Sequence, residues 1–179
     1  FTPSEMIKVA VCGGIGSGKS TVCQMFAERG IALYDSDSRA KTLMNESSSL
    51  REALIEEFGE ECYVEGVLNR PYLAQCVFSS EEKLAKLNSI VHPAVKADFE
   101  AWAEEQDCDY CILESAILFE SGFDKLVDKT VAILAPTPMR IERAMKRDGA
   151  SREQVESRVR AQMSDDELIE RADFAIVNI

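Results

Sequence analysis

A glycine-rich loop near the N-terminus constrains the fold of this chain more than any other feature. Residues 13–20 read GGIGSGKS, which matches the phosphate-binding pattern G-x-x-x-x-G-K-[S/T] in full. The apolar run from Ile7 to Cys12 precedes it and predicts a buried strand, whereas the stretch from Lys19 to Arg29, followed by Gly30, predicts a helix. A strand, this loop and a helix in succession predict a βαβ unit of a parallel sheet with a phosphate site.

The chemistry of this phosphate loop explains its residue types. Its glycines let consecutive backbone N–H groups turn towards a phosphate, and the helix N-terminus adds positive potential. Lys19 can reach the β- and γ-phosphate oxygens, and Ser20 is the expected Mg²⁺ ligand. The loop alone indicates nucleotide binding and no particular reaction, because switches, motors, transporters and kinases all use it. The expected nucleotide-binding residues are Gly14, Ile15, Gly16, Ser17, Gly18, Lys19, Ser20 and Thr21.

The rest of the chain predicts an α/β fold with a helical insertion. Short apolar runs at 31–35, 110–114, 130–135 and 174–178 predict further strands of the parallel sheet. Residues 39–106 have helical patterning with no obvious strand, and we expect Pro93 to interrupt it. The expected bounds are 6–38, 108–137 and 166–179 for a nucleotide-binding core flanked by helices, 39–107 for a helical substrate domain, and 138–165 for a short helical lid.

Composition and charge narrow the class of partner. The formal net charge of −12 argues against a nucleic-acid footprint spread over the surface. No apolar run approaches the roughly 20 residues that cross a bilayer, and the first residues lack the basic and apolar regions of a signal peptide. Six cysteines, mostly isolated in apolar surroundings, favour free thiols in a reducing compartment. We therefore expect a cytoplasmic enzyme without a membrane or nucleic-acid partner, as a monomer or a weak oligomer.

The motifs that are missing help to select the reaction. Neither N-K-x-D nor D-x-x-G occurs, which argues against a GTP-dependent switch, and no serine-glycine-rich transporter signature follows. Arg140, Arg143 and Arg147 are instead spaced to share one helical face. They suit either a solvated basic face or a lid that closes over a transferring phosphoryl group and excludes water. The second interpretation favours a kinase.

Two carboxylates follow the second predicted strand. Asp35 and Asp37 come where strands of an open parallel sheet face the ligand crevice, so either can take the proton of an acceptor hydroxyl. Either can equally cap the helix that starts near Ser38. Spacing alone does not separate the two residues.

Together the motifs resemble a known family. The segments GGIGSGKST, DSD, LNRPYLAQCVFSSEEKLAKLNSIVHP, ILFE, RIERAMKRDGAS and ADFAIVN resemble the dephospho-coenzyme A kinase family, in order and over nearly the whole chain. The resemblance implies a P-loop kinase core and Mg²⁺-dependent transfer of phosphate from ATP to the ribose 3′-hydroxyl of dephospho-coenzyme A. A related kinase acting on a nucleoside or nucleoside monophosphate is the first alternative, and a nucleotide-binding protein without an acceptor is the second.

The resemblance also assigns roles to residues at matching positions. It implies Asp37, Lys19, Arg143 and Arg147 as catalytic residues, Asn178 near the adenine, and Asp35, Asn88, His92, Arg158 and Gln162 at the substrate. Three positions depart from the family pattern. Glu114 stands where aspartate is common, Lys41 where arginine is common, and Arg140 where many members have glutamine.

Overall fold

The structure, a computed structural model, describes residues 6–179. The chain divides into two units. One unit joins the described residues up to Asp35 to Glu105–Ile179, and the other comprises Ser36–Glu104. The helices that we assign to a lid by sequence belong to the first unit, together with the phosphate loop.

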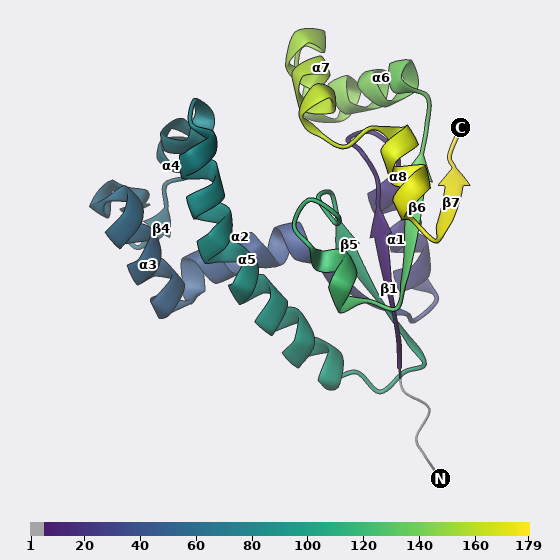
Figure 1. Cartoon of the computed structure of the whole chain (residues 1–179), viewed down its shortest axis with the longest axis horizontal. Coiled ribbons are helices and arrows are strands. Elements are labelled where there is room, and N and C mark those ends of the chain that lie inside the picture. The colour runs from purple at the N-terminus through teal and green to yellow at the C-terminus, as the bar shows by residue number, and fades with distance from the viewer. Residues whose placement is uncertain (1–5) are drawn as a thin grey trace. The chain divides into compact units, whose positions relative to one another are not determined.

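The first unit is built on a five-stranded parallel sheet with strand order β2-β5-β1-β6-β7 (Figure 1). Each neighbouring pair in this sheet is parallel, which confirms the predicted fold class. The predicted strands agree with the observed ones to within one residue at each end. The strands are β1 Ile7–Cys12, β2 Ala32–Asp35, β5 Tyr110–Ser115, β6 Lys129–Leu134 and β7 Phe174–Val177.

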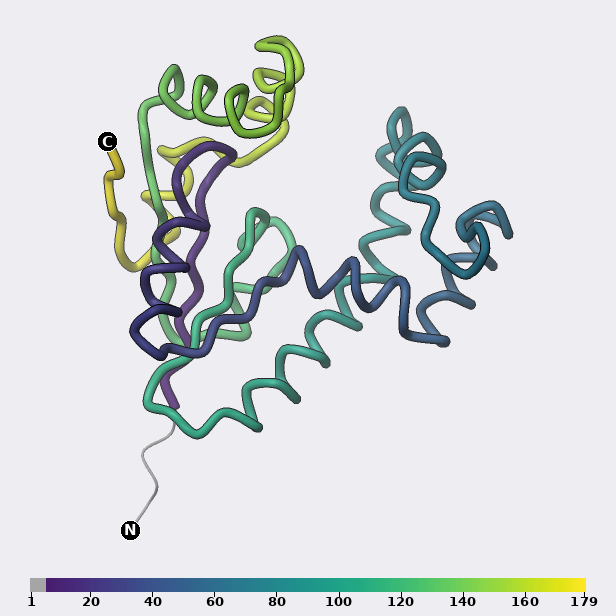
Figure 2. Tube along the Cα trace, turned by 180° about the vertical axis from the view of Figure 1, so that it is seen from behind, coloured from purple at the N-terminus to yellow at the C-terminus, as the bar shows by residue number. Residues whose placement is uncertain are grey.

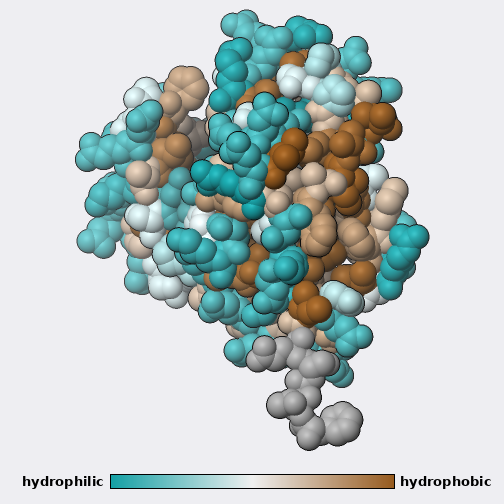
Figure 3. All heavy atoms as spheres, turned by 45° about the vertical axis from the view of Figure 1, so that its right-hand side comes forward, coloured by the Kyte–Doolittle hydropathy of each residue, from teal (hydrophilic) through white to brown (hydrophobic). Residues whose placement is uncertain are grey.

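The central strands owe their stability to burial of apolar side chains on both faces. Val11, Ile112 and Ile133 are buried in one cluster with Cys23 of the helix that follows the phosphate loop. The edge strand β7 differs, because Phe174 and its neighbours along the strand are exposed. Figure 3 shows apolar side chains at the surface on this side of the molecule.

Capping interactions delimit the helices of the first unit. The helix α6 ends at Gly149, which has a positive φ of 65°, and Ser151 then begins α7 with a capping box completed by Gln154. The Ser164 side chain accepts a hydrogen bond from the Glu167 N–H at the start of α8. The helices are α1 Lys19–Glu28, α6 Thr137–Asp148, α7 Arg152–Ala161 and α8 Asp165–Arg171, with a 3₁₀ turn at Phe123–Leu126.

The second unit is helical, as expected, but differs from the prediction in two respects. A hairpin of two-residue strands, β3 Tyr63–Val64 and β4 Val67–Leu68, turns at Glu65 and Gly66, which both have positive φ. Pro93 lies inside one continuous helix, because the buried face that includes Val91 and Phe99 spans it. The helices are α2 Ser36–Glu46, α3 Ser48–Phe58, α4 Arg70–Phe78 and α5 Glu81–Glu104, with a 3₁₀ turn at Glu60–Cys62.

The six cysteines are free thiols, as the sequence predicts. Among residues 6–179, no helix has the length and apolar character needed to span a bilayer.

Candidate functional site

The phosphate loop connects β1 to α1 at the carboxyl end of the sheet. Ser17 N–H donates to the Gly14 carbonyl at 3.1 Å, and Gly16 and Gly18 adopt positive φ values of 75° and 91°. A side chain on Gly18 would also collide with the Asn178 amide. Glycine is therefore required here both by backbone conformation and by the close approach of another segment.

A buried carboxylate lies beside the last two residues of the loop. Glu114 is in β5, which pairs with β1 in register, and it is 5% exposed. The Ser20 hydroxyl donates to Glu114 Oε1 at 2.8 Å, and Lys19 Nζ lies 3.8 Å from the same oxygen. The loop lysine and the hydroxyl thus share one carboxylate, which lowers the cost of burying that charge.

The oxygen atoms of Ser20 and Glu114 fit a magnesium site. Mg²⁺ prefers hard oxygen ligands and usually takes only one or two carboxylates from the protein, with waters and substrate phosphates completing its shell. In the part of the chain that the structure describes, no group of three or more His, Cys, Asp or Glu side chains could hold a metal ion. A cation here would depend on the phosphates of a bound nucleotide.

Asp35, one of the two carboxylates predicted after the second strand, lies next to Glu114. Asp35, the last residue of β2, pairs in register with Glu114 across the β2–β5 ladder. The carboxyl ends of these parallel strands therefore carry two adjacent acidic residues beside the phosphate loop.

The two buried thiols on either side of the loop in the sequence, Cys12 and Cys23, are not nucleophiles. Burial raises the pKa of the Cys12 and Cys23 thiols to about 12, with smaller contributions from nearby carboxylates. Both thiols are protonated at neutral pH, and they act as small apolar side chains in the core.

Arg143 links the lid helix to the loop and to the end of the sheet. Its Nη1 donates to the carbonyls of Gly16 at 3.4 Å and Ser17 at 3.5 Å, and both terminal nitrogens donate to the Asn178 carbonyl at 3.2 Å. The Asn178 side chain donates to the Ser17 carbonyl at 3.1 Å. The structure thus brings Arg143, which the resemblance implies is catalytic, against Gly16, Ser17 and Asn178, which are assigned to the nucleotide.

Gln162 also reaches the loop. Its Oε1 accepts the Ile15 N–H at 2.8 Å, across 147 positions of sequence. Both views of the trace place the segment between α7 and α8 beside the phosphate loop (Figures 1 and 2). The sequence assigns Gln162 to the substrate, whereas in this structure its side chain contacts the loop backbone.

Arg147 and Arg158 lie apart from these contacts. Arg147 makes a two-pronged ion pair with Asp148, at 2.8 and 3.1 Å, and Arg158 reaches the same carboxylate at 3.3 Å. Arg147 holds the pKa of Asp148 below its usual range. The side chains of Arg147 and Arg158 are 59% and 54% exposed, so both remain accessible to an anionic ligand.

The remaining predicted residues belong to the second unit. Asp37 lies in the first turn of α2, where the helix dipole favours a carboxylate. Asn88 and His92 lie on α5, and burial together with Lys96 lowers the pKa of His92, which favours the neutral imidazole. Arg39 forms a bidentate ion pair with Asp98, at 2.9 Å for each contact, that ties α2 to α5.

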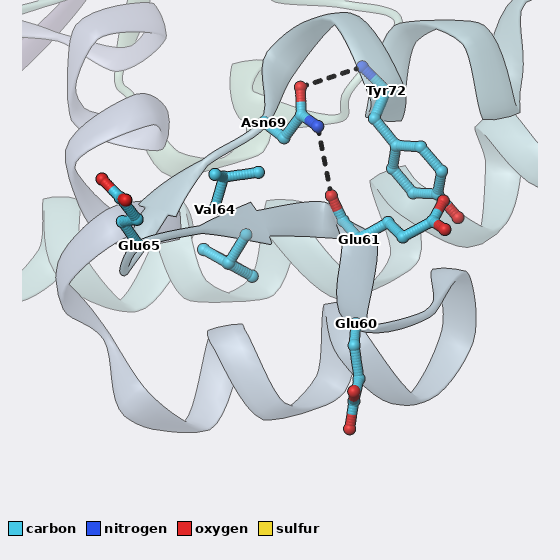
Figure 4. Close-up of a pocket in the computed structure, with 7 residues that line it drawn as sticks. Glu60, Glu61, Val64, Glu65, Asn69 and Tyr72 are labelled. Atoms are coloured by element: carbon cyan, nitrogen blue, oxygen red, sulfur yellow. Dashed lines mark hydrogen bonds between the residues drawn. The ribbon is translucent and has the colours of Figure 1, made fainter.

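A surface pocket in the second unit is lined by none of the predicted site residues (Figure 4). Three carboxylates line it, which disfavours a phosphate-rich ligand by charge repulsion. Its lining residues are Glu60, Glu61, Tyr63, Val64, Glu65, Asn69 and Tyr72.

Comparison with known proteins places this geometry in a family. The family model described as Dephospho-CoA kinase matches residues 7–179. The dephospho-CoA kinases of Porphyromonas gingivalis and Bacteroides fragilis are 45% and 44% identical, over 97% and 96% of this chain and 86% and 84% of their own. The crystal structure of TT1252 from Thermus thermophilus superposes with a TM-score of 0.87 at 35% identity, covering 97% of this chain and 89% of that one. The chain therefore belongs to the dephospho-CoA kinase family.

Proposed function

We propose that this protein transfers the γ-phosphoryl group of ATP to the ribose 3′-hydroxyl of dephospho-coenzyme A, giving coenzyme A and ADP in the last step of coenzyme A synthesis. The observation that carries the proposal is the Lys19, Ser20 and Glu114 cluster at the end of the phosphate loop, in a chain that belongs to the dephospho-CoA kinase family. A triphosphate bound at this loop would lie beside the Lys19 ammonium group and beside a site for Mg²⁺.

The loop amides and Lys19 hold the β- and γ-phosphates in this proposal. Ser20 and the Glu114 carboxylate beside it would hold Mg²⁺. The metal ion, when bound, neutralises charge on the phosphate oxygens. Arg143 lies at the loop already, and Arg147 exchanges Asp148 for a phosphate oxygen during transfer.

The acceptor side of the proposal rests on Asp37, whose role stays a prediction. The 3′-oxygen forms a bond to the γ-phosphorus, the bond from that phosphorus to the β–γ bridging oxygen breaks, and ADP leaves. The hydroxyl proton passes to the Asp37 carboxylate. Asn88 and His92 contact the substrate, and the neutral imidazole of His92 serves hydrogen bonding better than proton transfer at the reacting atom. Cytoplasmic location and the monomeric or weakly oligomeric state also stay predictions.

A coupled ADP-release assay across acceptors tests the function. We expect turnover with dephospho-coenzyme A and none above background with nucleosides or nucleoside monophosphates. Lys19→Met should abolish turnover, whereas Lys146→Met, which removes an exposed lysine of α6, should not. Turnover with a nucleoside or its monophosphate instead would identify the related kinase, and slow hydrolysis that no acceptor accelerates would identify a nucleotide-binding protein.

A further inference from the structure

The tip of the phosphate loop is held by groups outside the loop. The Ile15 side chain packs against the buried cluster of Ile141, Ala144 and Val155 between α6 and α7. Its N–H donates to Gln162 at 2.8 Å, and its carbonyl accepts from Arg140 Nη1 at 3.5 Å. The side chain and both backbone polar groups of one residue are thus all fixed by α6, α7 and the segment before α8.

Arg140 packs closely against two glycines of the loop. It lies in the early part of α6 and is 4% exposed. A side chain on Gly14 would collide with the Arg140 guanidinium, and one on Gly16 would collide with the Arg140 carbonyl. The two glycines therefore make room for Arg140 as well as for a phosphate.

The Arg140 guanidinium has one acidic neighbour within ion-pair range among the described residues. Its Nη2 lies 3.7 Å from Asp165 Oδ1 at the start of α8, which is beyond hydrogen-bond distance. Arg140 Nε and Asp165 Oδ1 are buried and have no hydrogen-bond partner in the part of the chain that the structure describes. Buried polar atoms left without a protein partner are uncommon and costly.

We propose that Arg140 is a positioning residue for the nucleotide, and that Asp165 holds its guanidinium against the phosphate loop. The pair keeps the loop backbone in the shape that receives a triphosphate. The inference rests on the proposed function only in that the loop binds ATP. It concerns a position where this chain departs from the family pattern described above, and it makes ATP affinity depend on Asp165, a residue with no place in the candidate site.

Equilibrium titration with Mg²⁺·ATP tests the proposal without an acceptor. We expect Arg140→Gln and Asp165→Asn each to raise the dissociation constant for ATP about tenfold, because each removes one partner of a charge pair in which Arg140 is buried. The double variant should resemble either single variant, because both substitutions disrupt the same contact. Arg152→Gln and Asp166→Asn, at exposed positions on α7 and α8, are the matched controls and should bind ATP as the original protein does.

Turnover and a conservative variant separate positioning from other roles. Turnover at saturating ATP should change less than about threefold in Asp165→Asn, because positioning acts on binding rather than on transfer. Normal ATP binding by Asp165→Asn beside weak binding by Arg140→Gln would overturn the proposal, since Arg140 would then act without its partner. If Arg140→Gln does not fold, Arg140→Lys keeps the charge, loses the planar donors and should still weaken ATP binding.

A protein that binds ATP as expected but does not phosphorylate dephospho-coenzyme A contradicts the proposed function and leaves this inference standing.

Discussion

Neutralising Glu114 tests the proposed magnesium site most directly. Glu114→Gln keeps the size of the side chain and an oxygen that can accept the Ser20 hydroxyl, and it removes only the charge. At the observed 3.8 Å, an effective dielectric constant of about 20 makes the gross attraction between Lys19 and Glu114 about 4 kcal/mol. Much of this attraction offsets the desolvation of two nearly buried groups, so the net loss of stability is smaller.

The larger consequence concerns the metal ion. Residues that hydrogen-bond to a metal's ligands, as Glu114 does to Ser20, typically contribute ten- to hundredfold to metal affinity or activity. We therefore expect the Mg²⁺ concentration for half-maximal turnover to rise by about ten- to hundredfold in Glu114→Gln, which corresponds to about 1.4–2.7 kcal/mol. A coupled ADP-release assay with Mg²⁺ varied at saturating ATP and dephospho-coenzyme A measures this constant.

Two companion variants make the result specific. Glu114→Asp keeps the charge on a shorter side chain, which leaves room for a water molecule beside Ser20, so its Mg²⁺ requirement should change less than that of the glutamine variant. Glu142→Gln removes an exposed carboxylate from α6 and should leave the requirement unchanged. An unaltered Mg²⁺ requirement in Glu114→Gln would refute the metal role, even if the variant were less stable.

Three further predictions concern the acceptor, the loop backbone and the buried thiols. Asp37→Asn should bind ATP normally in an equilibrium titration and lose turnover, and undiminished turnover would remove Asp37 from the mechanism. Gly18→Ala should abolish ATP binding, because a side chain there meets Asn178, whereas Gly149→Ala has open space and should cost only the roughly 1 kcal/mol of its positive φ, measured by denaturant unfolding. The raised pKa values of Cys12 and Cys23 predict that stability is retained below pH 9 and decreases from pH 9 towards pH 12, because the unfolded thiols lose their protons first. Unfolding midpoints across that range should shift less in Cys12→Ala than in the original protein.

The central strands of the parallel sheet could be predicted closely because they are buried on both faces. Continuous apolar runs such as Ile7–Cys12 are visible in the sequence without knowledge of any partner strand. The hairpin at Glu65 and Gly66 could not be predicted in this way, because strands of two residues are too short to show periodicity. The prediction of a break at Pro93 was wrong, since packing of a buried helix face outweighs the loss of one backbone hydrogen bond.

The candidate site divides along similar lines. The sequence by itself determined the phosphate loop. Its glycines are needed because the loop backbone adopts conformations that other residues disfavour, and its lysine is needed because a phosphate binds a positive charge. Only the tertiary structure revealed the hydrogen bonds between Glu114 and Ser20 and between Gln162 and Ile15. The same holds for the ion pair between Asp165 and Arg140. These contacts join residues that lie between 25 and 147 positions apart in the sequence, and the contact of Gln162 with Ile15 pairs a side chain with a backbone N–H. The order of residue types along the chain does not give the spatial distance between such groups. Local conformation is thus decided by residue type, whereas the groups that surround the loop are brought there by the packing of separate strands and helices.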